Sequence, residues 1–101
     1  MRFEYAAAAI DEIDEALAYY QAIDQDLSSR LVRELEDSLQ MILRFPLGWH
    51  PLGGGLRQRR VKSFPFVIVY QPKDDAIVSI AFANTHRRPD YWRNRLPSLS
   101  L

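Results

Sequence analysis

The segment FVIVYQ, at residues 66–71, limits the fold of this chain more than any other feature. Its apolar residues run on without alternating, so a strand here must be buried on both faces, as in the centre of a sheet. The turn-forming residues PKDD and a β-branched run, AIVSIAFAN, follow it and predict a last strand. Upstream, LRQRRVKSF predicts another strand, one face of which is strongly basic.

The first half of the chain opens with a short strand and continues with helical periodicity. MRFEY alternates apolar and polar residues, which predicts the strand. The apolar spacing then changes to that of one helix face, formed by Ile10, Ile13, Leu17 and Tyr20. Acidic residues at positions 11, 12, 14 and 15 fall in the early turns, where the helix dipole favours negative charge.

A second helix is predicted after a break at residues 24–26, with Asp26 as its candidate N-cap. Its apolar face comprises Leu31, Leu35, Leu39 and Ile42, and it must end before Pro46. Two helices joined by so short a link predict a helical hairpin.

Together these elements predict an α+β fold in the order β-α-α-β-β-β. The helical hairpin packs on one face of a small, mostly antiparallel sheet. Residues 46–55, PLGWHPLGGG, hold two prolines and four glycines and predict a loop. With 101 residues, the chain is expected to form a single domain, residues 1–101.

Composition narrows the possible classes of protein. Hydrophobic residues make up 48% and charged residues 26%, as in an ordinary globular protein. The chain has no cysteine, which excludes disulfides and thiolate metal sites and predicts a cytoplasmic location. No apolar run approaches the roughly 18 residues of a membrane span, so no membrane partner is expected. His50 and His86 lack metal-ligand spacing, and we expect no metal and no cofactor.

The net charge of zero conceals a strong asymmetry. Residues 1–49 hold four arginines against ten Asp or Glu residues, a balance of −6. Residues 50–101 hold nine Lys or Arg residues against three Asp residues, a balance of +6. This division predicts a basic face in the second half and an acidic, solvated face in the first.

Two groups of residues in the basic half are candidates for binding a target. One follows the predicted basic strand and the other lies in THRRPDYWRNRL, residues 85–96. Guanidinium groups bind phosphates or carboxylates through paired hydrogen bonds, and aromatic rings stack on bases or on arginines. The candidates are Arg57, Arg59, Arg60, Lys62, His86, Arg87, Arg88, Tyr91, Trp92, Arg93 and Arg95. Nucleic acid and an acidic partner protein both remain open as the target, and Trp92 is equally a candidate for closing the core.

The chain resembles the RelE/ParE superfamily of toxins from type II toxin–antitoxin modules. The resemblance rests on FPFVIVY at residues 64–70, a turn, a β-branched strand and then HRRPDYW at residues 86–92. A helix ending in YY, a second helix running into FP, a glycine-rich loop and an Arg-rich strand agree with it. It covers about residues 3–95 and is closest to the ParE-like, plasmid-stabilisation branch. It implies the same α+β fold and a cognate antitoxin as partner.

The resemblance also implies two alternative activities. RelE-like members cut messenger RNA on the ribosome, and in that case Arg87, His86 and Tyr91 would match their catalytic groups. ParE-like members poison DNA gyrase and are not nucleases. Ribonuclease members tend to carry an arginine in the central strand, whereas residues 66–69 here are wholly apolar, and this favours gyrase. A member that binds an antitoxin without being toxic is a third hypothesis.

Arg87 is the expected principal anchor for the target. It lies directly after the last predicted strand, where the sheet holds its backbone and its guanidinium reaches outward without a partner. Tyr91 and Trp92 would add contact area, and Arg93 and Arg95 a polar rim.

Overall fold

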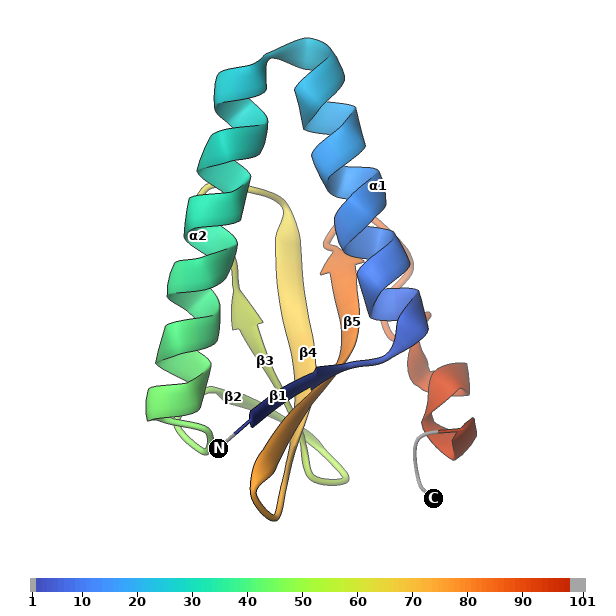
Figure 1. Ribbon diagram of the computed structural model, residues 1–101. Helices are drawn as coiled ribbons and strands as arrows, with labels where there is room; N and C mark the ends of the chain where they lie inside the picture. The colour runs from blue at the N-terminus through green and yellow to red at the C-terminus, as the bar shows by residue number, and fades with distance from the viewer. Residues whose placement is uncertain (1, 99–101) are drawn as a thin grey trace.

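A computed structural model describes residues 2–98, in which a helical hairpin lies across one face of a five-stranded sheet (Figure 1). The sheet order is β1-β5-β4-β3-β2, and every neighbouring pair is antiparallel except β1 with β5. The α+β prediction is therefore confirmed; Met1 of the expected first strand lies outside the described residues. The elements are β1 Arg2–Tyr5, α1 Ala7–Ile23, α2 Gln25–Arg44, β2 His50–Gly53, β3 Leu56–Arg60, β4 Phe66–Lys73, β5 Ala76–Asn84 and the 3₁₀ helix η1 Arg93–Ser98.

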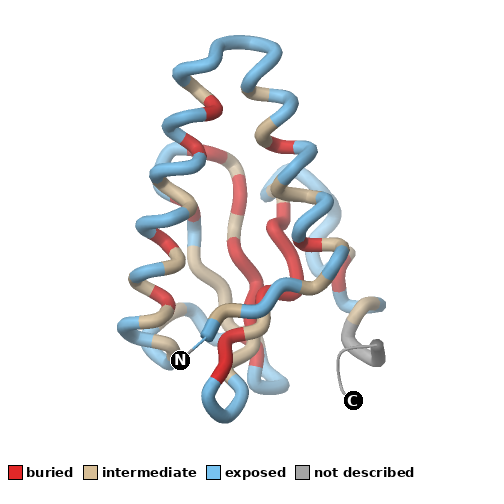
Figure 2. Tube along the Cα trace, viewed as in Figure 1, coloured by how far each residue is buried: buried red, intermediate tan, exposed pale blue. Residues whose placement is uncertain are grey.

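Strand β4 occupies the centre of the sheet and is buried on both faces, as its unbroken apolar run predicts (Figure 2). On one face Ile68 and Tyr70 pack against Leu31 and Ile42 of α2, in a cluster to which α1 also contributes. On the opposite face Val69 belongs to a second, smaller cluster. Two apolar layers thus share one strand, which ties both faces of the sheet together.

The predicted loop at residues 46–55 is wrong in part, because His50–Gly53 form strand β2 and add a fourth strand after the helices. Strand β2 pairs antiparallel with β3 at the edge of the sheet. Pro51 is compatible with this position, because an edge strand has a partner strand on one side only. Gly53, Gly54 and Gly55 all have positive φ angles and make the turn. The segment was predicted as a loop because the glycines and prolines of the turn dominate its composition.

The helices differ from the sequence expectation in three details. Helix α1 begins at Ala7, and its first turn holds no acidic residue. Ile10 is 45% exposed and lies outside the buried face, where Ala9 and Ala16 pack instead. Asp24, with extended backbone, caps α2 by accepting a hydrogen bond of 2.9 Å from the N–H of Asp26. Asp26 is thus the donor and not the cap, because only the residue before the helix has the required backbone geometry.

Strand β5 contains a bulge that decides how its second half is presented. Val69 pairs with Ala81 and Tyr70 with Ser79, so the pairing skips Ile80. An extra residue reverses the alternation beyond it. As a result the Phe82 side chain packs in the helix-side cluster while Ile80 packs in the opposite one. Strand β1 pairs with β5 only as far as Ser79, so that within residues 2–98 the outer edge of β5 has no partner strand from Ile80 onward.

Trp92 closes the second cluster and is only 4% exposed. It packs there with Leu56, Val69 and Ile80. Of the two roles that the sequence left open for this ring, the structure supports the core. Its indole is therefore covered and offers no contact area to a target.

Among residues 2–98, no helix is both long enough and apolar enough to cross a lipid bilayer.

Replacement of Trp92 by alanine should destabilise the fold by about 3–5 kcal/mol, because it removes a large buried ring and leaves a cavity. Unfolding in urea, followed by circular dichroism, measures this loss without relying on tryptophan fluorescence. Tyr19→Ala is the matched control, since that ring is 64% exposed and should cost about 1 kcal/mol or less. Equal losses for the two variants would contradict a core role for Trp92.

Candidate target-binding cleft

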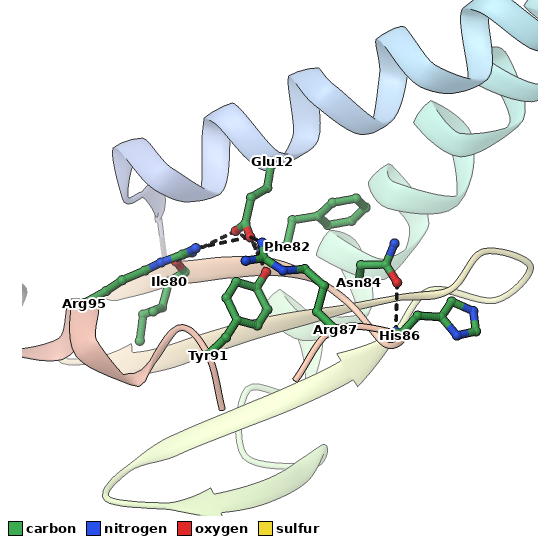
Figure 3. A network of polar contacts seen from close by, with 8 residues as sticks. All are labelled: Glu12, Ile80, Phe82, Asn84, His86, Arg87, Tyr91 and Arg95. Atoms are coloured by element: carbon green, nitrogen blue, oxygen red, sulfur yellow. Dashed lines mark hydrogen bonds and ion pairs between the residues drawn. The ribbon is translucent and has the colours of Figure 1, made fainter. Parts of the chain in front are cut away.

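A cleft of about 350 Å³ opens where α1, the second half of β5 and the segment after β5 meet. Its floor includes the stacked rings of Phe66 and Phe82, whose centroids are 4.5 Å apart. One wall comes from α1 through Glu12, Glu15, Ala16, Tyr19 and Tyr20. The other comes from Asn84, His86, Arg87 and Tyr91 (Figure 3). The cleft therefore combines an aromatic floor with charged walls of both signs.

Glu12 is the centre of the polar contacts at this site (Figure 3). Its Oε1 accepts hydrogen bonds from the Phe82 N–H at 3.1 Å and from Nη1 of Arg95 at 2.8 Å. Its Oε2 accepts from the Tyr91 hydroxyl and from Nη2 of Arg95 at 3.2 Å. The carboxylate is only 12% exposed, and this complete set of donors offsets the cost of burying its charge.

Arg95 binds Glu12 from the far side of the site and also donates to the Ile80 carbonyl at 3.3 Å. Its hydrogen bond to Glu12 is the main cause of a raised pKa, which keeps the guanidinium charged. Arg95 and Glu12 together satisfy the Ile80 carbonyl and the Phe82 N–H on the edge of β5 that β1 leaves open. The side chain expected in an outer rim is thus held inside the structure, 20% exposed.

Arg87 lies between the Tyr91 ring and the mouth of the cleft. Its guanidinium carbon is 3.8 Å from the centroid of that ring, and its Nη1 is 3.9 Å from Oε2 of Glu12. The expectation of an arginine without a partner is therefore wrong, because one face of the guanidinium is stacked. The side chain is still 57% exposed, and no hydrogen bond of its guanidinium occurs within the described part. Since Arg95 already balances the charge of Glu12, Arg87 adds a surplus positive charge.

The two residues that the sequence suggested as an acid or base differ in their surroundings. Burial, followed by the hydrogen bond to Glu12 and the charge of Glu12, raises the pKa of Tyr91 to about 12. Its hydroxyl therefore stays protonated at neutral pH and serves as a donor to Glu12. His86 is exposed, and its ring points away from Glu12 (Figure 3). Its backbone N–H donates to Oδ1 of Asn84 at 2.8 Å, and no hydrogen bond of its ring occurs within residues 2–98.

The arginines of β3 do not form a continuous basic face with this cleft. Arg57 and Arg59 lie opposite Tyr70 and Ile68 and so face the helix side of the sheet. There Arg57 donates to the Trp49 carbonyl at 2.9 Å, and the Arg59 guanidinium stacks on the Trp49 ring at 4.0 Å. These two side chains brace the segment that leads into β2.

The remaining basic candidates are dispersed over the surface. Arg60, Lys62 and Arg88 are exposed. Arg93 pairs with Asp90 at 3.4 Å, stacks over the Trp92 ring and donates to the Leu52 carbonyl at 3.4 Å. The structure thus brings together only His86, Arg87, Tyr91 and Arg95 of the predicted set at one site.

Sequence reasoning missed Glu12 and the aromatic floor. Glu12 is one of four neighbouring acids in α1, and nothing local separates it from the exposed Asp11, Asp14 and Glu15. Phe82 was recognised only as part of a strand. Among the described residues, no group of three or more His, Asp or Glu side chains is placed to hold a metal ion.

Comparisons with known proteins agree with this fold. The model of the family described as the ParE toxin of the type II toxin–antitoxin system, parDE, matches residues 3–91. A solved chain from a chromosomal ParDE toxin–antitoxin system of P. aeruginosa superposes with a TM-score of 0.72 at 13% sequence identity. That superposition covers 85% of this chain and 97% of the other, and it concerns the fold alone. The sequence matches none of the curated proteins with which it was compared. The family match spans most of the chain, and the protein belongs to the ParE toxin family of type II toxin–antitoxin systems.

Proposed function

We propose that this protein arrests growth by binding DNA gyrase in the cytoplasm and that a cognate antitoxin neutralises it. Membership of the ParE toxin family supports the toxin role. A solved ParDE system with the same fold supports the expectation of an antitoxin. The choice of gyrase as the target rests on two points. The sequence is ParE-like, and the cleft residues Tyr91 and 66–69 are poorly suited to cleaving RNA.

The observation that carries the proposal is the engagement of Tyr91 by Glu12. Cleavage of RNA requires a group that takes a proton from the ribose hydroxyl near neutral pH. A hydroxyl with a pKa of about 12, donated to a carboxylate, is poorly suited to that task. Catalysis also needs a cation on the phosphate that is cut. The central strand that floors the cleft has no cation at residues 66–69. The engaged Tyr91 hydroxyl and the apolar central strand therefore support a protein that acts by binding its target and not by cleaving RNA.

Arg87 is our proposed anchor for the target. Its position after β5 is fixed by a hydrogen bond from its backbone N–H to the Asn84 carbonyl, 3.1 Å long. Stacking on Tyr91 holds the guanidinium while leaving its donors accessible. An arginine held in this way loses little conformational freedom on binding, which is a property of residues that dominate interfaces.

Expression of the protein alone in a bacterial host should stop growth, and co-expression with the small protein encoded beside it should restore growth. The reason is that the antitoxin would cover the surface around Arg87, through which the toxin is proposed to bind its target. Growth curves and colony counts after induction measure both effects. Normal growth in both strains would refute an active toxin and favour a member that only binds an antitoxin.

Ribosome-bound messages should show no new codon-specific ends after induction, because the Tyr91 hydroxyl is held by Glu12 and residues 66–69 of the central strand carry no cation. Primer extension on abundant transcripts is the measurement.

In parallel, the purified protein should inhibit supercoiling by purified gyrase. Cleavage in the ribosomal A site with unaffected supercoiling would overturn the proposal and establish the ribonuclease alternative, with Arg87, His86 and Tyr91 as its candidate residues.

Arg87→Ala should abolish growth arrest while the protein remains folded. Loss of one well-placed arginine at a desolvated contact costs about 2–4 kcal/mol of binding. The cost to folding should be only about 1 kcal/mol, because the ion pair is long and exposed and the stacking is on the surface. The exposed Arg33 on α2 provides the control, Arg33→Ala, which should stay toxic. A folded and fully toxic Arg87→Ala protein would remove Arg87 from the binding surface.

A further inference from the structure

We infer that Ser63 is a phosphorylation site, at which the added phosphate competes with Glu34 for Arg30 and loosens the connection between β3 and β4. These three side chains lie outside the cleft. The effect of the modification on Arg87 rests on the proposed function, whereas its effect on the fold does not.

Ser63 is an exposed serine in an irregular segment. Residues 61–65 join β3 to β4 and form neither a helix nor a strand. Of the serines whose burial the structure describes, only Ser29 and Ser63 are exposed, and Ser29 lies within α2. Surface segments without regular hydrogen bonding are where other enzymes gain access to a folded chain. Ser63 is therefore the serine best placed for modification.

Positive charge surrounds the Ser63 hydroxyl. Arg60 and Lys62 precede it in the sequence, and both are exposed. From α2, Nη2 of Arg30 donates to Oγ of Ser63 at 3.1 Å, and the Arg30 side chain is 53% exposed. A protein kinase whose substrate groove carries acidic residues is attracted to such a surface. The charge pattern therefore favours a serine kinase that prefers basic sequences.

The modifying reaction is phosphoryl transfer from ATP. Oγ of Ser63 attacks the γ-phosphorus, and its bond to phosphorus forms as the bond from phosphorus to the β,γ-bridging oxygen breaks. ADP leaves with that electron pair, and the hydroxyl proton passes to a base of the kinase. The product carries a charge of about −1.5 to −2 at pH 7 and three acceptor oxygens.

Glu34 makes Ser63 a position where this charge alters the structure. Its Oε1 accepts from the Ser63 N–H at 2.7 Å, and its Oε2 accepts from Nε of Arg30 at 3.1 Å. The carboxylate is only 12% exposed. Burial acts to raise the pKa of Glu34, but hydrogen bonds from Ser63 and Arg30 lower it overall, so the group is ionised at neutral pH. A phosphate on Ser63 would therefore be repelled by Glu34 and would share Arg30 with it.

The same connection is tied to the segment that carries Arg87. The Pro65 carbonyl accepts from the Thr85 N–H at 2.8 Å and from the Thr85 hydroxyl at 3.3 Å. Thr85 lies two positions before Arg87. Loss of the bond between Ser63 and Glu34 thus loosens a segment to which the start of the Arg87 segment is attached. Under the proposed function, phosphorylation weakens binding of the target.

Two variants of nearly equal shape test the effect of charge at position 63. Ser63→Asp should lower the midpoint of thermal unfolding by about 4–8 °C relative to Ser63→Asn, which lacks the charge. In a Glu34→Gln background this difference should vanish or change sign, because Arg30 then attracts the aspartate and no acid opposes it. Ser29→Asp is the control and should melt as the parent does. Equal midpoints for the two variants at position 63 would overturn the inference.

The modification itself is measured on the full chain made by cell-free synthesis. The chain is incubated with ATP and a purified serine kinase that prefers basic sequences. Mass spectrometry should find one phosphate, on Ser63 and not on Ser29, and Ser63→Ala should stay unmodified. The chain isolated from its own bacterium should carry the same phosphate in growing or stationary cultures. Absence of phosphate from Ser63 in either experiment would overturn the inference.

Hydrogen exchange of the phosphorylated chain separates this inference from the proposed function. The Ser63 amide should exchange about tenfold faster or more, because its acceptor on Glu34 is lost, and the Thr85 amide should also exchange faster. Unchanged exchange after phosphorylation would refute the inference alone. In cells, Ser63→Asp should arrest growth less than Ser63→Asn. Normal growth with the parent chain would refute the proposed toxin and leave the exchange result standing.

Discussion

The ion pair between Glu12 and Arg95 provides the hydrogen bonds that a further strand would otherwise make with the edge of β5. Beyond Ser79 that edge has no pairing with β1, and its Phe82 N–H and Ile80 carbonyl point to where a strand would continue. Glu12 accepts from the first, and Arg95 donates to the second. Unpaired groups at a buried edge would cost free energy and would also invite pairing with another chain. The ion pair between Glu12 and Arg95 removes both problems and fastens the C-terminal segment to α1.

This arrangement separates the arginines of the second half into two classes. Arg57, Arg59 and Arg95 are partly covered and act on this molecule's own carbonyls, rings and carboxylates. Arg60 and Arg88 are exposed, and Arg87 is exposed on one face. The basic balance of the second half therefore overstates the charge available to a partner. Much of it stabilises the fold, and the part available at the cleft is essentially one guanidinium.

The elements that sequence reasoning identified are those whose signals are local. The unbroken run at residues 66–71 predicted a central strand, and the spacing from Leu31 to Ile42 predicted the buried face of α2, because each depends only on periodicity. Strand β2 was missed because turn-forming glycines and an edge proline dominate its composition. The role of Glu12 was missed for a different reason. Its partners Tyr91 and Arg95 lie 79 and 83 positions away, and no local pattern encodes such a contact.

The large distance in sequence between Glu12 and its partners affects the order in which the parts of the cleft form during folding. Contacts between distant residues require closure of long loops, and their conformational cost delays them relative to local contacts. The helical hairpin and the β4–β5 pair rest on short-range contacts and can form early. The wall of the cleft that carries Arg87 and Tyr91 is connected to α1 through Glu12, which accepts hydrogen bonds from Tyr91 and Arg95. A partly folded chain could thus possess the helices and much of the sheet and still lack the cleft that we propose as the binding site. Any capacity to harm a host cell would arise only at the last stage of folding.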